Sequence, residues 1–199
     1  MVQPETSSYL TLDARIANPP PGLLAKYTRR EQEFFFDYAN FMLRIFDDSS
    51  IRERLRRILA IEEIKILRDI DLRIMVFPAR SLPGRSNHVL HGSYNQTTSQ
   101  ISLYPLKISK LWIRTNGQFL FRRQFVQLSE IGRKVLCEIA SSGLGTLIHE
   151  FLHVKFEHAG MGRYAEEAVV RKLEHQHMRE WGMKLEEDIA NILAGSLPA

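Results

Sequence analysis

The chain has 199 residues, with an apolar share of 44% and a charged share of 25%. These values suit one globular domain and argue against the disordered and membrane-spanning classes. No apolar run approaches the ~20 residues of a spanning helix, and the first residues lack the basic start and apolar stretch of a signal peptide. A single cysteine, Cys137, excludes an internal disulfide and suits the reducing cytoplasm, where we expect the protein to act.

The net charge of +4 makes the chain mildly basic, with arginines gathered at 29–30, 52–57 and 122–123. A basic surface attracts nucleic acid or acidic partners without specifying either. Acidic residues lie within and after the second group, as on a solvated helix face. A nucleic acid is therefore a partner that the charge pattern permits and does not specify.

Residues 1–25 are expected to be an extended arm, because Pro19-Pro20-Pro21-Gly22 cannot continue a helix and favours polyproline geometry. One domain is expected over residues 26–199. Its first part, 26–70, is a predicted helical pair, and its second part, 71–199, is a sheet plus the helices of the candidate site.

Apolar residues begin to recur at helical spacing near Arg29, and Ser50 is placed to cap the second helix of the pair. The run 72–77 has strand composition and ends at a proline. Gly92 is a turn signal in the polar stretch that follows, and Asn116-Gly117 between apolar runs predicts a hairpin turn. Residues 100–104 alternate polar and apolar before another proline, which is typical of a half-buried strand near a sheet edge.

The remainder of the chain has helical patterning. One helix is predicted to open at Ser129-Glu130, a second to run from Ser142 to Glu157, and a last one from about Tyr164 into the region of Ile189, after a glycine-containing break. The predicted fold class is therefore α+β, mostly helical with a small mixed sheet.

The second of these helices contains His149-Glu150-Phe151-Leu152-His153. Residues four apart share a helix face, so both imidazoles can bind one Zn²⁺. Glu150 lies beside them, where it can take a proton from metal-bound water and pass it to a leaving amine. Apolar residues at helical spacing anchor the helix in a core, namely Leu144, Leu147, Ile148, Phe151 and Leu152.

A catalytic zinc takes three protein ligands and keeps a fourth position open. One zincin class uses a histidine six residues after the second motif histidine, following a glycine. That pattern fails here, because the two positions hold Ala159 and Phe156. His158 is one residue short of the required position and lies at the expected helix end.

The next helix offers Glu166 and Glu167 as the third ligand. Glu166 falls among Val170 and Leu173 on an apolar stripe, where a carboxylate is costly unless it is paired or metal-bound. Glu167 falls at the edge of that stripe, which suits a metal at a rim open to substrate. Both can also be first-turn acids that the helix dipole stabilises. We expect one of the two to be a ligand and leave the choice open.

A donor to the developing oxyanion is also needed in peptide hydrolysis. His177 lies on the face of Glu166 but about three turns away, whereas Arg163 and Tyr164 are nearer in sequence. Each of the three has an ordinary structural interpretation, and none is selected.

The segment 146–153, followed by a glutamate-bearing helix, resembles the gluzincins, the thermolysin-like zinc metallopeptidases with His, His and Glu ligands. In size it is similar to minimal gluzincins and to phage or bacterial HExxH proteins, and the resemblance spans about residues 71–185. It implies a zincin-like fold, a Zn²⁺ cofactor, a peptide or protein substrate, and an edge strand at Ile101, Ser102 and Leu103 that pairs with extended substrate. The chain departs from the family at the polar residue four positions after the ligand, which is Val170 or Arg171 here.

Two other interpretations stay open. A metal-binding zincin-fold protein can act as a regulatory or nucleic-acid-associated factor without proteolytic turnover, in which case replacing Glu150 by Gln spares its role. A purely structural helical protein without metal is the third.

Overall fold

The computed structural model describes residues 12–19, 22–64, 70–76, 79–80, 89–105, 120–122, 124–156 and 159–195. Over these residues the chain is mostly helical, with helices α1 (Arg29–Asp47), α2 (Ser49–Ile61), α4 (Glu130–Phe156) and α5 (Arg163–Gly195). Short 3-10 turns lie at Leu24–Lys26, Leu120–Arg122 and Phe125–Gln127.

The main sheet has the strand order β1 (Leu12–Ala17), β2 (Ile70–Met75), β6 (Gln100–Leu103) and β5 (Gly92–Asn95). The first three strands run parallel, and β5 is antiparallel to β6. A separate two-stranded ladder joins β3 (Ala79–Arg80) and β4 (Val89–Leu90). The expected α+β class with a small mixed sheet is therefore confirmed.

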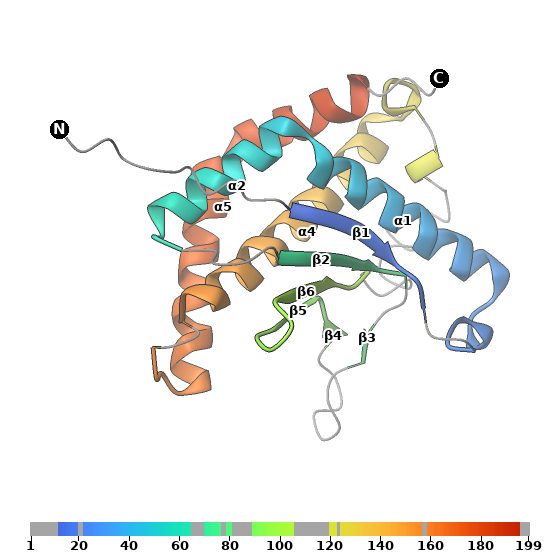
Figure 1. Cartoon of the computed structure of the whole chain (residues 1–199). Helices are drawn as coiled ribbons and strands as arrows, with labels where there is room; N and C mark the ends of the chain where they lie inside the picture. The colour runs from blue at the N-terminus through green and yellow to red at the C-terminus, as the bar shows by residue number, and fades with distance from the viewer. Residues whose placement is uncertain are drawn as a thin grey trace.

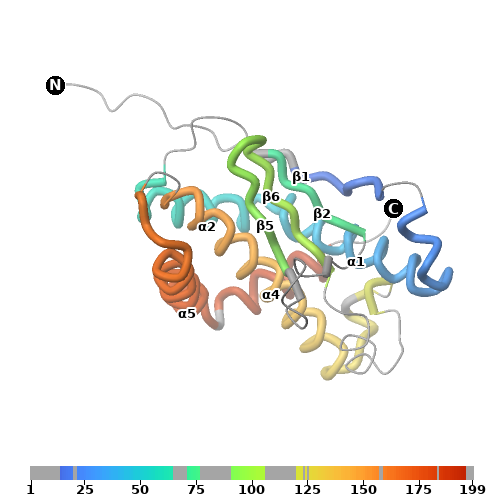
Figure 2. Tube along the Cα trace, turned by 90° about the horizontal axis from the view of Figure 1, so that it is seen from below, coloured from blue at the N-terminus to red at the C-terminus, as the bar shows by residue number. Residues whose placement is uncertain are grey.

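The two faces of the sheet differ in polarity. On the outer face, Asp71 of β2 pairs with Arg15 at 2.9 Å and with Arg73 at 2.8 Å. The opposite face is apolar and packs on the helices, with α1 against β1 and β2 and α4 against β5 and β6 (Figures 1 and 2). Its buried side chains are Leu72, Ile74, Ile101 and Leu103. Burial of this face places α4 directly under the β5 side of the sheet.

The two N-terminal helices are present as expected, and each is capped by side chains next to it in the sequence. Thr28 and Glu31 form a capping box at the start of α1. The cap of α2 is Asp48, whose carboxylate accepts from the backbone N–H groups of Ser50 and Ile51. The prediction of Ser50 as the cap is wrong by two residues, because Asp48 ends α1 and can serve the next helix at once.

The expected edge position of residues 101–103 is wrong. Strand β6 is paired on both sides, with β2 and with β5, so the backbone of Ile101, Ser102 and Leu103 lies inside the sheet and cannot add a substrate strand. Among the described residues the edge strand on this side is β5, which begins at Gly92, the residue expected to be a turn. Its short polar sequence carries little strand signal, and only its pairing with β6 makes it a strand.

Residues 12–17, part of the expected arm 1–25, form the other edge of the sheet as β1. The two predicted helices from Ser129 and Ser142 are one continuous helix, α4. Packing overrides the weak helix propensity of Ser141-Ser142-Gly143, because α4 is buried between the sheet and α5. Its apolar stretch is long enough to span a membrane, but 67% of that window is buried inside the fold. Asn116-Gly117 lies outside the described residues.

Helix α5 folds back along α4, as the glycine-containing break predicts, and changes direction at Gly182 (Figure 1). A buried polar junction joins it to the other helices. The Glu62 carboxylate at the end of α2 accepts from Lys155 Nζ of α4 at 2.7 Å and contacts His177 Nε2 of α5 at 2.6 Å. Burial alone would raise the pKa of Glu62, but the hydrogen bonds and charges of Lys155 and His177 hold it below its ordinary value.

Replacing Glu62 by Gln should lower the free energy of unfolding by roughly 3 kcal/mol at pH 7, because it leaves His177 and Lys155 without their carboxylate. The pKa of Glu62 is lower in the folded protein than in the unfolded chain, near 4.5. The stabilisation is therefore complete above that pH and is lost as the pH falls through the folded value. Urea denaturation from pH 7 to pH 3 measures it. Glu53→Gln, which breaks only the two exposed ion pairs with Arg56 and Arg57, should change stability by less than about 1 kcal/mol.

Candidate metal centre

The two motif histidines lie one turn apart on α4 and turn the same ring atom toward each other. His149 Nε2 and His153 Nε2 are 3.2 Å apart. Their side chains are 17% and 22% exposed, so the pair is sheltered but open to a solute. The spacing in the sequence thus produces the shared face that it predicts.

Glu167 of α5 completes a triad with these nitrogens. Its Oε1 lies 3.6 Å from His149 Nε2, and its Oε2 lies 3.6 Å from His153 Nε2. Zinc–nitrogen and zinc–oxygen bonds of about 2.0–2.1 Å in a tetrahedron put ligand atoms about 3.3 Å apart. The three donors, all within 4.8 Å of one another, therefore fit one ion and leave a fourth position for a non-protein ligand.

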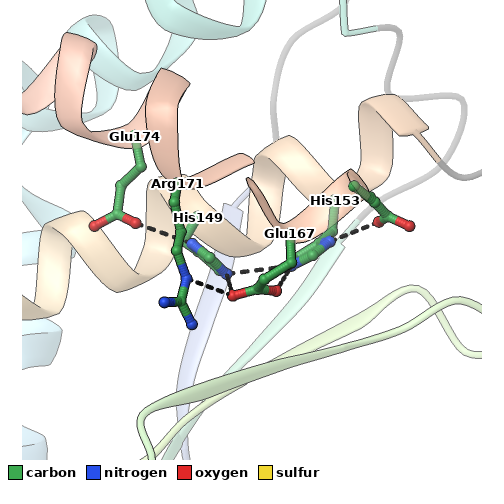
Figure 3. Close-up of polar contacts among 6 residues, drawn as sticks. His149, His153, Glu167, Arg171 and Glu174 are labelled. Carbon is green, nitrogen blue, oxygen red and sulfur yellow. Dashed lines mark hydrogen bonds and ion pairs between the residues drawn. The ribbon is translucent and has the colours of Figure 1, made fainter. Parts of the chain in front are cut away.

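The other nitrogen of each ring contacts a second carboxylate from α5, as Figure 3 shows. His149 Nδ1 lies 2.9 Å from Glu174 Oε2, and His153 Nδ1 lies 2.7 Å from Glu166 Oε1. An ionised carboxylate can only accept, so each Nδ1 carries a proton, and in a neutral imidazole this leaves the Nε2 lone pair for a metal at the triad. Carboxylates in this outer position fix the tautomer and orientation of a metal-binding imidazole.

The helix packing places the two adjacent glutamates, between which the sequence leaves the choice open, in different positions. Glu167 faces both Nε2 atoms, whereas Glu166 is paired with the outer nitrogen of His153. The apolar stripe correctly indicates that Glu166 needs a partner, but that partner is an imidazole. Glu174 was not predicted to have a role, although it lies two helical turns after Glu167 on the same face. Gly145 of α4 lies opposite this carboxylate, where an added Cβ would meet Glu174 Oε1 at a tight 3.3 Å.

Arg171 holds the triad carboxylate from the solvent side. Its Nε donates to Glu167 Oε1 at 2.8 Å. Burial alone would raise the pKa of Glu167, but the hydrogen bond from Arg171 and the charges of Arg171, His149 and His153 keep it below its ordinary value. Burial alone would lower the pKa of His149, but the hydrogen bond that it donates to Glu174 and the charges of Glu150, Glu167 and Glu174 raise the pKa above its ordinary value. The residue four positions after Glu167 is thus a cation, Arg171, and it binds the candidate ligand.

Glu150 lies between α4 and the edge strand and is 6% exposed. The backbone N–H of Tyr94 donates to its carboxylate, and an added Cβ at Gly92 would lie 2.6 Å from its Oε1. Burial raises the pKa of Glu150 to about 7, and the charges of Glu167 and Glu174 add to this effect, whereas His149 and the Tyr94 bond oppose it. Nothing in the sequence indicated that Gly92 contacts the candidate base. Its lack of a side chain allows β5 to lie directly on Glu150.

Strand β5 directs part of its backbone away from the sheet. Tyr104 N–H donates to His91 C=O at 2.8 Å, which makes this pair a hydrogen-bonded one. Antiparallel pairs alternate, so the N–H and C=O groups of Gly92 and Tyr94 point outward from the edge. The Tyr94 bond to Glu150 agrees with this orientation. The outward edge of β5 therefore lies beside the triad helix.

The remaining candidates lie elsewhere. His177 is buried on Glu62, as described for the polar junction, and is not part of the triad. Tyr164 is 78% exposed at the start of α5, and Arg163 is also exposed. Cys137 is half-buried, and burial raises its pKa, as expected for an unreactive thiol. His158 lies outside the described residues.

No family model, no curated protein and no solved structure matches this chain. Inferences about function therefore rest on the residues of the site itself.

Gly92→Ala should displace either β5 or Glu150, because its Cβ would lie within 3 Å of Glu150 and of Thr146. We expect a loss of about 1–3 kcal/mol in unfolding free energy. Thermal and urea unfolding measure this loss. Gly132→Ala on α4 is the matched control, since its nearest contact would be an ordinary 3.4 Å, and an unchanged or higher stability is expected there. Equal behaviour of the two variants would contradict the close approach of β5.

Glu174→Gln should weaken Zn²⁺ binding by about 10- to 100-fold, because a neutral amide holds His149 Nδ1 less firmly and lowers the basicity of Nε2. Competition with a chromogenic chelator measures the dissociation constant. Glu180→Gln, an exposed change on the same helix, serves as the control. An unchanged affinity in Glu174→Gln would show that the outer carboxylate does not act on the metal.

Proposed function

We propose that this protein is a zinc-dependent metallopeptidase that hydrolyses peptide bonds in extended peptide or protein substrates. The observation that carries the proposal is the set of three donors, His149, His153 and Glu167, at 3.2–3.6 Å spacing on two facing helices. A buried carboxylate, Glu150, accompanies them on the helix that bears both histidines.

The number and exposure of the donors favour catalysis over a structural metal. Structural zinc sites are closed by four protein ligands, whereas hydrolytic sites use three and admit water. Among the described residues, the triad is the group of His, Cys, Asp and Glu donors close enough for one ion, and each member is partly exposed. Bound zinc supplies Lewis-acid polarisation of a carbonyl and lowers the pKa of a water ligand.

The protein residues then have distinct tasks. Glu150 takes a proton from the attacking water and returns it to the leaving amine. Its carboxylate is kept in place by the Tyr94 N–H and by the close approach of Gly92. Glu166 and Glu174 hold the two imidazoles so that their Nε2 atoms keep their direction.

Substrate is held by strand addition at β5 in place of β6. The outward N–H and C=O groups of Gly92 can pair with an extended peptide backbone, while the N–H of Tyr94 stays on Glu150. A peptide on this edge lies next to Glu150, so its scissile carbonyl is within reach of the base. Backbone pairing alone places few demands on side chains, which suits a protein substrate in extended form.

Purified wild-type protein should contain one Zn²⁺ per chain and should cleave an unfolded protein substrate, with both properties lost in His153→Ala. Glu150→Gln should retain zinc and lower kcat/KM by about 10²- to 10⁴-fold, because the general base is removed while the metal ligands stay. Metal analysis and a fluorogenic casein assay measure these effects.

The outcomes separate the competing functions. Equal zinc in wild type and His153→Ala would remove the metal site from consideration. Zinc-loaded wild type without turnover, together with an unaltered partner interaction in Glu150→Gln, would favour a regulatory binding protein over a peptidase.

A further inference from the structure

Arg171 has binding capacity that the triad does not use. Its hydrogen bond to Glu167 engages Nε alone, and within the described part of the chain its two outer nitrogens make no hydrogen bond. The side chain is 66% exposed. Figure 3 shows it extending from α5 past His149, with the guanidinium beside Glu167 and its outer nitrogens directed away from that carboxylate. The two outer nitrogens of the Arg171 guanidinium are thus N–H donors that face solvent beside the candidate metal centre.

The fork is close to the position of the reacting bond. A metal ion bound by Glu167 lies about 2 Å from the carboxylate oxygen, and Arg171 Nε lies 2.8 Å from Oε1. For an ion on Oε1, Arg171 Nε is then within about 5 Å of the ion, and its outer nitrogens are about one bond length or two farther away. Residues of an extended peptide follow at about 3.3 Å intervals. A side chain or terminal carboxyl on a residue adjacent to the scissile bond is therefore within reach of Arg171.

The charge around the triad makes this cation decisive for an acidic substrate. Glu166, Glu167 and Glu174 surround the two imidazoles, and Glu150 adds a fourth carboxyl group. Zn²⁺ at the triad would offset two of these charges, so a further cation is needed to hold a substrate carboxylate beside the remaining acidic groups. A guanidinium fork matches the two oxygens of a carboxylate in a bidentate pair, which gives orientation as well as attraction.

We propose that Arg171 is a specificity-determining residue that binds a carboxylate on the substrate residue next to the cleaved bond, so that the preferred substrates are acidic or carboxyl-terminal peptides. The inference rests on the proposed peptidase function. Arg171 keeps its contact with Glu167 through Nε while the outer nitrogens take the substrate group.

The test uses the full-length zinc-loaded protein and a random-sequence peptide mixture, with cleavage sites read by mass spectrometry. Asp, Glu or the chain terminus should be enriched beside the cleaved bonds. A matched pair of peptides is then made, with Glu or Gln at that position. Wild type should favour the Glu peptide by about 10-fold or more in kcat/KM. Arg171→Gln should abolish this preference, and Arg171→Lys should restore only part of it because it lacks the fork.

Arg179→Gln is the matched control, an exposed arginine two turns further along α5, and it should keep the full preference. Zinc content is measured in every variant. An equal loss on both peptides in Arg171→Gln would overturn the inference, since Arg171 would then act only on Glu167. The absence of an acidic preference in wild type would overturn it as well. A zinc-loaded wild type that cleaves nothing would instead refute the proposed function itself.

Discussion

Two imidazoles on α4 can keep a fixed direction only if acidic side chains of α5 hold them, and the arrangement of the centre depends on this contact between the helices. Each ring has one nitrogen on an outer carboxylate and the other facing Glu167. The first twelve residues of α5 supply all three carboxylates, and the absence of a side chain at Gly145 leaves room for the one from Glu174. A shift of α5 by one turn would separate every one of these pairs.

The clustering of carboxyl groups opposes folding, since like charges close together raise the free energy of the folded state. The imidazoles and Arg171 offset part of this repulsion. The pKa of Glu150 is raised to about 7 chiefly by burial, and the charges of Glu167 and Glu174 add to that effect. The surrounding scaffold is correspondingly well packed, with α4 buried between sheet and helix. A cluster of carboxyl groups that disfavours folding is common at functional sites, where chemistry rather than stability selects the residues.

Local features of the centre were predictable and long-range ones were not. The shared face of His149 and His153 follows from helix geometry alone. The choice between Glu166 and Glu167 depends on the rotation of α5 against α4, which no spacing within one helix specifies. The place of β6 inside the sheet depends on β5, a short polar strand that forms only through pairing, and on β1, which comes from far back in the chain.

Strand β1 has a consequence for the integrity of the sheet. It covers the side of β2 that would otherwise present unpaired backbone groups, and it does so in parallel, through residues that precede the first helix. Removing β1 would leave β2 as an exposed edge strand with unpaired backbone N–H and C=O groups, next to the apolar face of the sheet. Self-association of chains without β1, through the exposed edge of β2, is then the expected consequence, so β1 protects this edge of the sheet.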